Sequence, residues 1–338
     1  MRVLFIGGTG LISSACAAEA VRRGMDVTLL VRGHSRDYLP PSGARVLQGD
    51  IRADPAAVAR ALPQEPFDAV VDWVAYVPEH IETDLELFAT RARQFIFISS
   101  ASVYQKPPVH YVYREDTPAV NPYWSYARDK IACEERLVRA WRETGFPITI
   151  VRPSHTYGPS RLPLALSARK GFTPIARLLR GKPLIVHGDG TSLWTVTWNE
   201  DFARAFVALL GHPGAIGQTI HITSDEVLNW NQIHQIIARE VGVEARLQHL
   251  TTDYLVSQSP DLAGPLWGDK AWSAVFDNSK IKRLCPGFVA TVSLAEGVRR
   301  ALAWFAERPE RREVDEAADA RWDALIAAYV RATETGTA

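Results

Sequence analysis

The sequence has few cysteines, no net charge and no long apolar run. Its 338 residues include only three cysteines, which are widely spaced at Cys16, Cys133 and Cys285. This usage is typical of a protein of the reducing cytoplasm and argues against a disulfide framework, so we expect a cytoplasmic location. Lys and Arg number 38 and so do Asp and Glu, which favours neither nucleic acid nor an anionic membrane as a partner. No apolar run approaches the length of a membrane-spanning helix.

Metal-ligand spacing and repeats are also missing from the sequence. The nine histidines show no ligand-like spacing with cysteines or carboxylates, so we predict no metal site. We find no internal repeat and no low-complexity segment. A chain of this length forms one large domain or two.

A glycine-rich turn stands near the start of the chain. Residues 3–6 (Val-Leu-Phe-Ile) read as a buried strand, residues 7–10 are Gly-Gly-Thr-Gly, and the small residues from Ser13 onward read as a helix. Gly7 permits the tight turn and Gly10 lets the backbone approach a pyrophosphate, which the helix N-terminus would attract. A purely structural turn is the first alternative.

A secretory signal peptide is the second alternative for this segment, because Arg2, an apolar stretch and residues 15–17 (Ala-Cys-Ala) resemble one. The glycines of residues 7–10 break its apolar region, however. We therefore favour the interpretation that this segment is a strand, turn and helix that bind a dinucleotide.

The end of the second predicted strand bears on the choice of cofactor. Residues 26–31 form this strand, and an NAD site typically has an acidic residue at its end. Here Arg32 follows it, with Arg36 close behind. Arg32 could pair with the 2′-phosphate of NADP or stack on adenine, so the sequence favours NADP over NAD. The alternative is that Arg32 simply faces solvent.

Further strands are predicted at residues 45–48, 70–75 and 95–98, and helices at residues 202–210 and 230–241. Asp50, just after the first of these strands, could accept hydrogen bonds from an adenine amino group. Strands that alternate with helical segments predict an α/β fold with a Rossmann-type doubly wound parallel sheet.

Tyr126 and Lys130 are the candidate chemical groups. A spacing of four residues places the phenol and the ammonium on one helix face. A phenol is a poor base at neutral pH, but a nearby ammonium lowers its pKa by stabilising the phenolate. The pair alone is a common pattern. The Tyr126–Lys130 pair becomes a specific signal for catalysis because it follows both a dinucleotide loop and a serine-rich segment (residues 99–104).

The ordered motifs together resemble those of the extended short-chain dehydrogenases/reductases, the NAD-dependent epimerase/dehydratase family. The resemblance covers about residues 1–304 and rests on residues 7–10, 49–50, 99–104, 126–130, 152–153, 157–159, 188–190, Asp201, Asp277, 279–280 and 296–297. It implies a Rossmann domain, a smaller C-terminal substrate-binding domain and a homodimer. By position it implies Ser100, Tyr126 and Lys130 as the catalytic triad.

From this resemblance we expect a mainly NAD(P)-binding domain at residues 1–160 and mainly substrate-binding segments at residues 161–310. Strands are expected to return to the Rossmann sheet around residues 195–225, and residues 311–338 to form a helical tail. We expect the cofactor to contact Gly7, Thr9, Gly10, Leu11, Ile12, Arg32, Asp50, Ile51, Ala75, Tyr126, Lys130, Pro153 and His155. We expect the substrate to contact Ser102, His155 and Trp194, and residues 257–272 to cover it.

Two positions depart from the family pattern. Relatives that act on nucleotide sugars typically have Asn where this chain has His155, and often have Arg near Trp194 to bind the diphosphate. Both changes argue against an ordinary nucleotide sugar, although four arginines (Arg161, Arg169, Arg177, Arg180) could substitute. His155 is alternatively a structural histidine, and Trp194 a core tryptophan. The sugar dehydratases carry an Asp-Glu pair where Ala101 and Ser102 stand here, which disfavours dehydration.

We therefore predict an NAD(P)-dependent enzyme that oxidises or reduces a secondary alcohol or ketone of a sugar-like or nucleotide-sugar substrate, with Tyr126 as acid/base. Redox-neutral, epimerase-type chemistry is favoured. The alternatives are an NADPH-dependent ketoreductase on a small molecule and a non-catalytic, cofactor-sensing or RNA-binding member of the fold. The expected partner is a small molecule, with no nucleic acid and no membrane.

Overall fold

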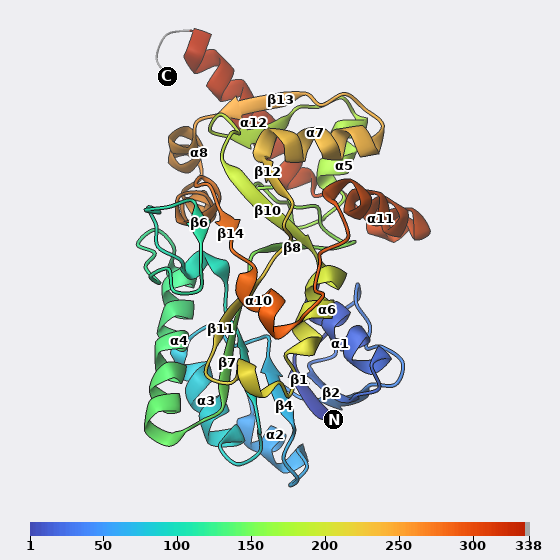
Figure 1. Ribbon diagram of the computed structural model, residues 1–338. Helices are drawn as coiled ribbons and strands as arrows, with labels where there is room; N and C mark the ends of the chain where they lie inside the picture. The colour runs from blue at the N-terminus through green and yellow to red at the C-terminus, as the bar shows by residue number, and fades with distance from the viewer. Residues whose placement is uncertain (335–338) are drawn as a thin grey trace.

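The computed structural model describes residues 1–334 and consists of a large lower domain and a smaller upper one (Figure 1). The lower domain is built on a seven-stranded sheet in the order β11-β7-β5-β4-β1-β2-β3, in which all neighbours are parallel. Its strands are β1 (Arg2–Ile6), β2 (Asp26–Val31), β3 (Arg45–Gln48), β4 (Ala69–Asp72), β5 (Phe95–Ile98), β7 (Ile148–Pro153) and β11 (Thr219–Ile222). The strand order reverses between β1 and β4, as in a doubly wound fold.

Helices cover both faces of this sheet. The helices α1 (Ser13–Arg22) and α6 (Asn199–Ala208) share an apolar cluster on one face, where Ala17 and Ala20 of α1 are fully buried. The other face is covered by α2 (Pro55–Ala61), α3 (Pro78–Phe88) and α4 (Ser125–Thr144). Because both faces are buried, the central strands are continuous apolar runs. The predicted Rossmann-type α/β fold is confirmed.

The predicted strands at residues 26–31, 45–48 and 95–98 are confirmed, but the fourth strand is shorter than predicted. It ends at Asp72 instead of residue 75. The Asp72 carboxylate accepts hydrogen bonds from the backbone N–H of Val74 (2.6 Å) and Ala75 (2.8 Å), which turns the chain away from the sheet.

The smaller domain contains a three-stranded sheet formed by β8 (His155–Tyr157), β10 (Leu193–Trp198) and β12 (Val227–Asn229). Two strand pairs join it, β9 (Leu184–His187) with β13 (Leu247–Leu250) and β6 (Val112–Tyr113) with β14 (Val275–Phe276). Its helices include α5 (Thr173–Leu179), α7 (Trp230–Val241), α8 (Thr252–Gln258), α9 (Ala263–Pro265), α11 (Leu294–Glu307) and α12 (Glu316–Glu334). The helix α10 (Ser279–Leu284) packs instead on the large sheet, where Ile281 joins the apolar cluster of α1 and α6. Of the strands between residues 195 and 225, β11 joins the large sheet and β10 the small one.

Helix α12 is fastened to α5 by buried charges. The Arg177 guanidinium is fully buried and donates to the Asp319 carboxylate at 2.6 Å, and Lys182 donates to the same carboxylate at 2.6 Å. The predicted tail at residues 311–338 thus includes a docked helix from Glu316 to Glu334, and its last four residues lie outside the described part of the chain.

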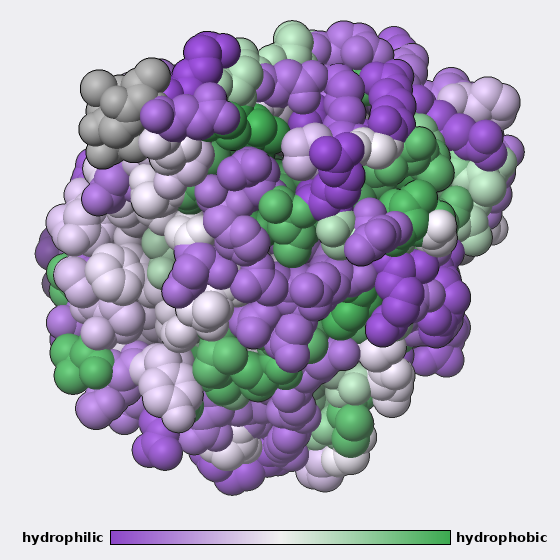
Figure 2. All heavy atoms as spheres, turned by 90° about the horizontal axis from the view of Figure 1, so that it is seen from above, coloured by the Kyte–Doolittle hydropathy of each residue, from purple (hydrophilic) through white to green (hydrophobic). Residues whose placement is uncertain are grey.

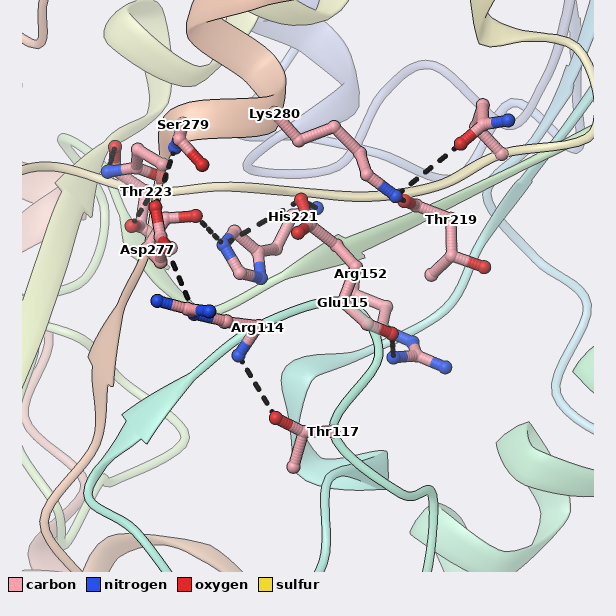
Figure 3. A network of polar contacts seen from close by, with 12 residues as sticks. Arg114, Glu115, Thr117, Arg152, Thr219, His221, Thr223, Asp277, Ser279 and Lys280 are labelled. Carbon is pink, nitrogen blue, oxygen red and sulfur yellow. Dashed lines mark hydrogen bonds and ion pairs between the residues drawn. The ribbon is translucent and has the colours of Figure 1, made fainter.

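A polar network joins the two domains (Figure 3). His221 on β11 makes a 2.8 Å hydrogen bond through Nε2 to the backbone carbonyl of Asp277, and Arg152 on β7 donates to the carbonyl of Glu115 at 3.3 Å. Arg114 pairs with the Asp277 carboxylate at 3.2 Å. These contacts hold β14 against the carboxyl ends of β7 and β11, where the chain enters the smaller domain.

The upper face of the molecule is mainly hydrophilic, with apolar residues in separate small patches (Figure 2). None of the helices in residues 1–334 is both long and apolar enough to cross a membrane. The same residues contain no group of three or more His, Cys, Asp or Glu side chains arranged to hold a metal ion.

Candidate active site

The functional side chains gather at the carboxyl ends of the central strands. Residues that follow β1, β4, β5 and β7 reach the same edge of the parallel sheet, at the point where the strand order reverses. This is where ligands bind in open α/β sheets. Two neighbouring cavities lie there, one toward β2 and β3 and the other toward the smaller domain.

The first cavity has a volume of about 340 Å³ and has the features of a nucleotide site. Five residues predicted to contact the cofactor line it: Gly7, Thr9, Arg32, Asp50 and Ile51. Of the others, Gly10, Leu11 and Ile12 lie beside it in the loop that leads into α1, whereas Ala75 follows β4. Three further members of the predicted cofactor set, Tyr126, Pro153 and His155, line the second cavity instead.

The glycine loop fits a bound pyrophosphate. Gly7 and Gly8 have φ of +98° and +118°, which disfavour any residue with a Cβ, and a Cβ on Gly8 would lie 2.9 Å from Leu29. A Cβ on Gly10 would meet only the Ser13 hydroxyl, at 3.2 Å, so this side of the loop is open. No side chain among the described residues caps α1, but the Ser14 N–H donates to the carbonyl of Gly10 at 3.0 Å and the Gly10 N–H donates to the Ser13 hydroxyl at 2.9 Å. An anion at this helix end would therefore bind the other N–H groups of the first turn.

Asp50 and Arg32 face each other at the mouth of this cavity. The Asp50 carboxylate accepts hydrogen bonds from the backbone N–H of Arg52 (2.9 Å) and Ala53 (3.2 Å), which lower its pKa. The Arg32 guanidinium lies 4.0 Å from Asp50, and its side chain is 68% exposed. Arg32 is therefore free to turn toward a ligand and is held only by a weak surface ion pair.

A buried charge cluster beneath the cavity was missed by sequence reasoning. Arg52 donates to Asp84 at 2.8 Å, to the carbonyl of His80 at 2.9 Å and also to Asp72, and both carboxylates are fully buried. Burial, and then the charge of Asp72, raise the pKa of Asp84. The cluster fastens the loop after β3 to β4 and α3. The only sequence signal was an acidic residue, Asp72, inside an apolar strand.

Ser100, Tyr126 and Lys130 come together as predicted from the sequence. Ser100 follows β5 and caps a short 3₁₀ helix, η1 (Ala101–Val103), by accepting from the backbone N–H of Ser102 at 3.2 Å. Tyr126 is the second residue of α4, and Lys130 lies one turn later on the same face. The Lys130 ammonium is 5.9 Å from the centre of the Tyr126 ring.

The helix that carries Tyr126 does not include Asn121. It starts at Ser125, and Asn121 has a different task. The Asn121 amide donates to the carbonyls of Ser102 and Gly268, each at 2.7 Å, and so ties the serine segment to the smaller domain. Sequence reasoning did not assign this role, because Gly268 is 147 residues away along the chain.

Burial perturbs the pKa of both titratable residues of the triad. It raises the pKa of Tyr126 to about 12, against a smaller lowering by the hydrogen bond to Ser100. It lowers the pKa of Lys130 to about 8. Lys130 donates to the carbonyls of Ala75 (2.6 Å) and Ile98 (2.7 Å), which leaves one of its three N–H donors for a ligand. Strongly perturbed groups in a cavity are typical of functional sites.

The second cavity, of about 280 Å³, is lined by Tyr126. Ser100, Ser102, Pro153, His155 and Trp194 also line it, so the predicted substrate contacts lie together. Residues 257–272, predicted to cover the substrate, supply Asp269 and Lys270 to its wall, two residues that sequence reasoning did not single out.

The rings of His155 and Trp194, which line this cavity, pack against the fully buried Trp230. The His155 ring lies 6.1 Å from that of Trp194 and 6.0 Å from that of Trp230. Burial holds the pKa of His155 well below its usual range, so the imidazole is neutral. Its Nδ1 is buried without a partner among the described residues, whereas the Trp194 indole N–H donates to the carbonyl of Trp272 at 2.9 Å.

Comparison with known proteins agrees with this geometry. The family model described as "NAD dependent epimerase/dehydratase family" matches residues 3–223. The 2′-dehydrokanamycin reductase of Streptomyces kanamyceticus is 25% identical over 292 residues, which cover 85% of this chain and 80% of that protein. A trifunctional UDP-glucose 4,6-dehydratase/UDP-4-keto-6-deoxy-D-glucose 3,5-epimerase/UDP-4-keto-L-rhamnose-reductase of Arabidopsis thaliana is 25% identical over 339 residues, and the chain spans 48% of its length.

A solved structure shows the shared fold. The UDP-glucuronic acid 4-epimerase of Bacillus cereus, in complex with UDP-glucuronic acid and NAD, superposes with a TM-score of 0.72 at 22% sequence identity. The match covers 91% of this chain and 99% of the epimerase chain.

Proposed function

Because the chain belongs to the NAD-dependent epimerase/dehydratase family, we propose that it transfers a hydride between a nicotinamide dinucleotide and a secondary alcohol or ketone of a sugar-like substrate. The predicted family and the prediction of an enzyme are confirmed. The observation that carries the proposal is the meeting of Ser100, Tyr126 and Lys130 between a nucleotide-sized cavity and a second cavity of about 280 Å³.

Each residue of the triad has a role that its position supports. Tyr126 exchanges a proton with the substrate oxygen, and Ser100 donates a hydrogen bond that orients the same oxygen. Lys130 binds the nicotinamide ribose through its remaining N–H and stabilises the Tyr126 phenolate. The dinucleotide, when bound, supplies or accepts the hydride at C4 of its nicotinamide ring. Asp50 and Arg32 would bind its adenosine end, the glycine loop its pyrophosphate, and Pro153 and His155 the nicotinamide side.

Two reaction types are compatible with this site, and redox-neutral epimerisation remains our first prediction. The similarity to a 2′-dehydrokanamycin reductase favours the second, a ketone reduction that consumes NADPH. To separate them, the purified protein is denatured and any released nucleotide is identified by mass spectrometry. A tightly retained NAD or NADP supports the epimerase. An empty protein that binds NADPH and releases NADP supports the reductase, and failure to bind either dinucleotide would contradict both.

We propose that the enzyme prefers NADP because Arg32, and no carboxylate, follows β2. The substitution Arg32→Glu is expected to raise the dissociation constant for NADPH about tenfold and to change that for NADH little, because it removes a charge-assisted contact worth about 1.5 kcal/mol. Both constants are measured by fluorescence titration. Arg45→Glu, at an exposed position on β3, is the matched control. An unchanged ratio of the two constants would show that Arg32 does not bind the 2′-phosphate.

The pKa of Lys130, about 8, sets a testable pH dependence. Below this pH the side chain is an ammonium that can bind the ribose and stabilise the phenolate, and above it the charge is lost. We therefore expect kcat/KM to fall as the pH rises above about 8, while Tyr126, with its pKa of about 12 in the protein without ligand, stays protonated there. A profile that is flat from pH 7 to 10 would be inconsistent with this role.

The predicted homodimer and cytoplasmic location stay predictions. Light scattering of the purified chain tests the first and cell fractionation the second.

A further inference from the structure

The cavity beside Tyr126 contains one ion pair. Asp269 and Lys270 lie on the helical turn η4 (Leu266–Lys270), with 3.1 Å between the Lys270 ammonium and the Asp269 carboxylate, and each side chain is 14% exposed. Among the described residues that line the cavity, these two carry the only charges, because the buried His155 is neutral. The cavity wall therefore has no net charge.

The turn that carries this pair is held firmly. The carbonyl of Lys270 accepts hydrogen bonds from His187 Nε2 (2.9 Å) and from the Trp230 indole (3.1 Å). Its neighbour Gly268 packs against Trp124 so closely that a Cβ there would lie 2.9 Å from the Trp124 Cβ. Positions fixed by such contacts keep the two charges in place when a substrate binds.

The charges of Asp269 and Lys270 affect the pKa values of Tyr126 and His155, which also line the cavity. Burial is the main cause of the raised pKa of Tyr126 and of the lowered pKa of His155, and the charges of Asp269 and Lys270, respectively, add to these shifts. The pair is thus part of the electrostatic environment in which a bound substrate would sit.

The four arginines that the sequence offers for binding a diphosphate do not line this cavity. The guanidinium of Arg177 is buried against Asp319 of α12, and that of Arg180 pairs with Glu316 at 3.5 Å. Arg161 and Arg169 are exposed and do not line the cavity. A dianionic group placed in this cavity would meet the Asp269 carboxylate and a Lys270 already neutralised by it.

We propose that the Asp269–Lys270 pair determines substrate specificity, admitting a neutral polyhydroxylated ring and rejecting the diphosphate of a nucleotide sugar. The proposal rests on the proposed function, because it takes this cavity as the substrate site. Carboxylate oxygens accept from hydroxyl groups and an ammonium donates to them, so the pair matches a diol without net charge. Trp124 and Trp194 supply apolar surface for the C–H face of such a ring.

The test uses two probes and the variant Asp269→Asn. The full chain, saturated with NADP, is titrated by calorimetry with methyl α-D-glucopyranoside, a neutral ring, and with UDP-glucose, a nucleotide sugar. In Asp269→Asn the affinity for the glucoside is expected to fall about tenfold, because the amide is a weaker acceptor. The affinity for UDP-glucose is expected to rise about tenfold, because a repulsive charge is removed and Lys270 is released.

Opposite shifts distinguish specificity from damage to the fold, which would weaken both probes together. Glu244→Gln, at an exposed position, is the matched control and is expected to change neither affinity. Lys270→Met is a second variant, expected to weaken UDP-glucose further because Asp269 is left unpaired. The proposal would be overturned if Asp269→Asn changed the two affinities in the same direction or not at all. It would also be overturned if the unmodified protein bound UDP-glucose more tightly than the glucoside. Since binding needs no turnover, this outcome is independent of whether Tyr126 is the acid/base.

Discussion

Replacing Tyr126 by phenylalanine is expected to lower kcat by about 10²- to 10⁴-fold, the usual contribution of a positioned acid/base. The substitution removes only the phenol oxygen. The ring remains packed 5.0 Å from that of Trp124 and 6.5 Å from that of Tyr76, so the helix and both cavities are retained. Stopped-flow measurement of hydride transfer at 340 nm, with enzyme and cofactor in excess, reports the chemical step directly.

The matched control is Tyr123→Phe, which makes the same change three residues earlier at a side chain 38% exposed. It is expected to leave kcat unchanged. Binding of NADPH is expected to be the same in both variants and in the unmodified protein, because Tyr126 acts on the substrate oxygen. A Tyr126→Phe variant with full activity would contradict the proposed chemistry. A variant that leaves the cellular role of the protein untouched would instead favour a non-catalytic, cofactor-sensing or RNA-binding role.

The second large effect is expected at Lys130, where both turnover and cofactor binding depend on one ammonium. Lys130→Ala removes the group that would bind the ribose and stabilise the phenolate, so kcat is expected to fall by at least about 10²-fold. The dissociation constant for NADPH is expected to rise about tenfold or more, since a hydrogen bond from a charged group is worth about 1.5–3 kcal/mol. Steady-state kinetics and fluorescence titration measure the two effects separately.

Lys130 also has a structural role, and the experiment has to separate it from the catalytic one. Its ammonium joins the carbonyls of Ala75 and Ile98, which follow β4 and end β5, so loss of the side chain leaves two buried acceptors unpaired. Lys130→Met keeps the aliphatic stem and serves as a better-packed variant, while Lys282→Ala, at an exposed lysine, is the control. If Lys130→Met retains both the fold and normal NADPH affinity, the assigned ribose contact is wrong.

Local sequence patterns predicted most strands of the Rossmann domain. Mainly apolar runs predicted β2 and β5 with the right bounds, because a parallel strand buried on both faces is apolar. The edge strand β3 was also predicted with the right bounds, although its residues Arg45–Gln48 are mostly exposed. Tyr126 and Lys130 could be placed on one face from their spacing alone, since four residues make about one helical turn. The fourth strand was predicted too long because apolar residues continue past Asp72, whose side chain ends the strand through hydrogen bonds that no apolar pattern records.

The sequence by itself determined the glycine loop, the strands around it and the Tyr126–Lys130 pair, because each depends on backbone conformation or spacing within a few residues. Only the tertiary structure decided which distant groups share the site. Asn121 meets Gly268, Arg52 meets Asp84, and Asp269 and Lys270 reach the cavity beside Tyr126. Such contacts join segments tens to more than a hundred residues apart. Their partners are set by the packing of distant elements within and between the two domains, and no local periodicity encodes that packing.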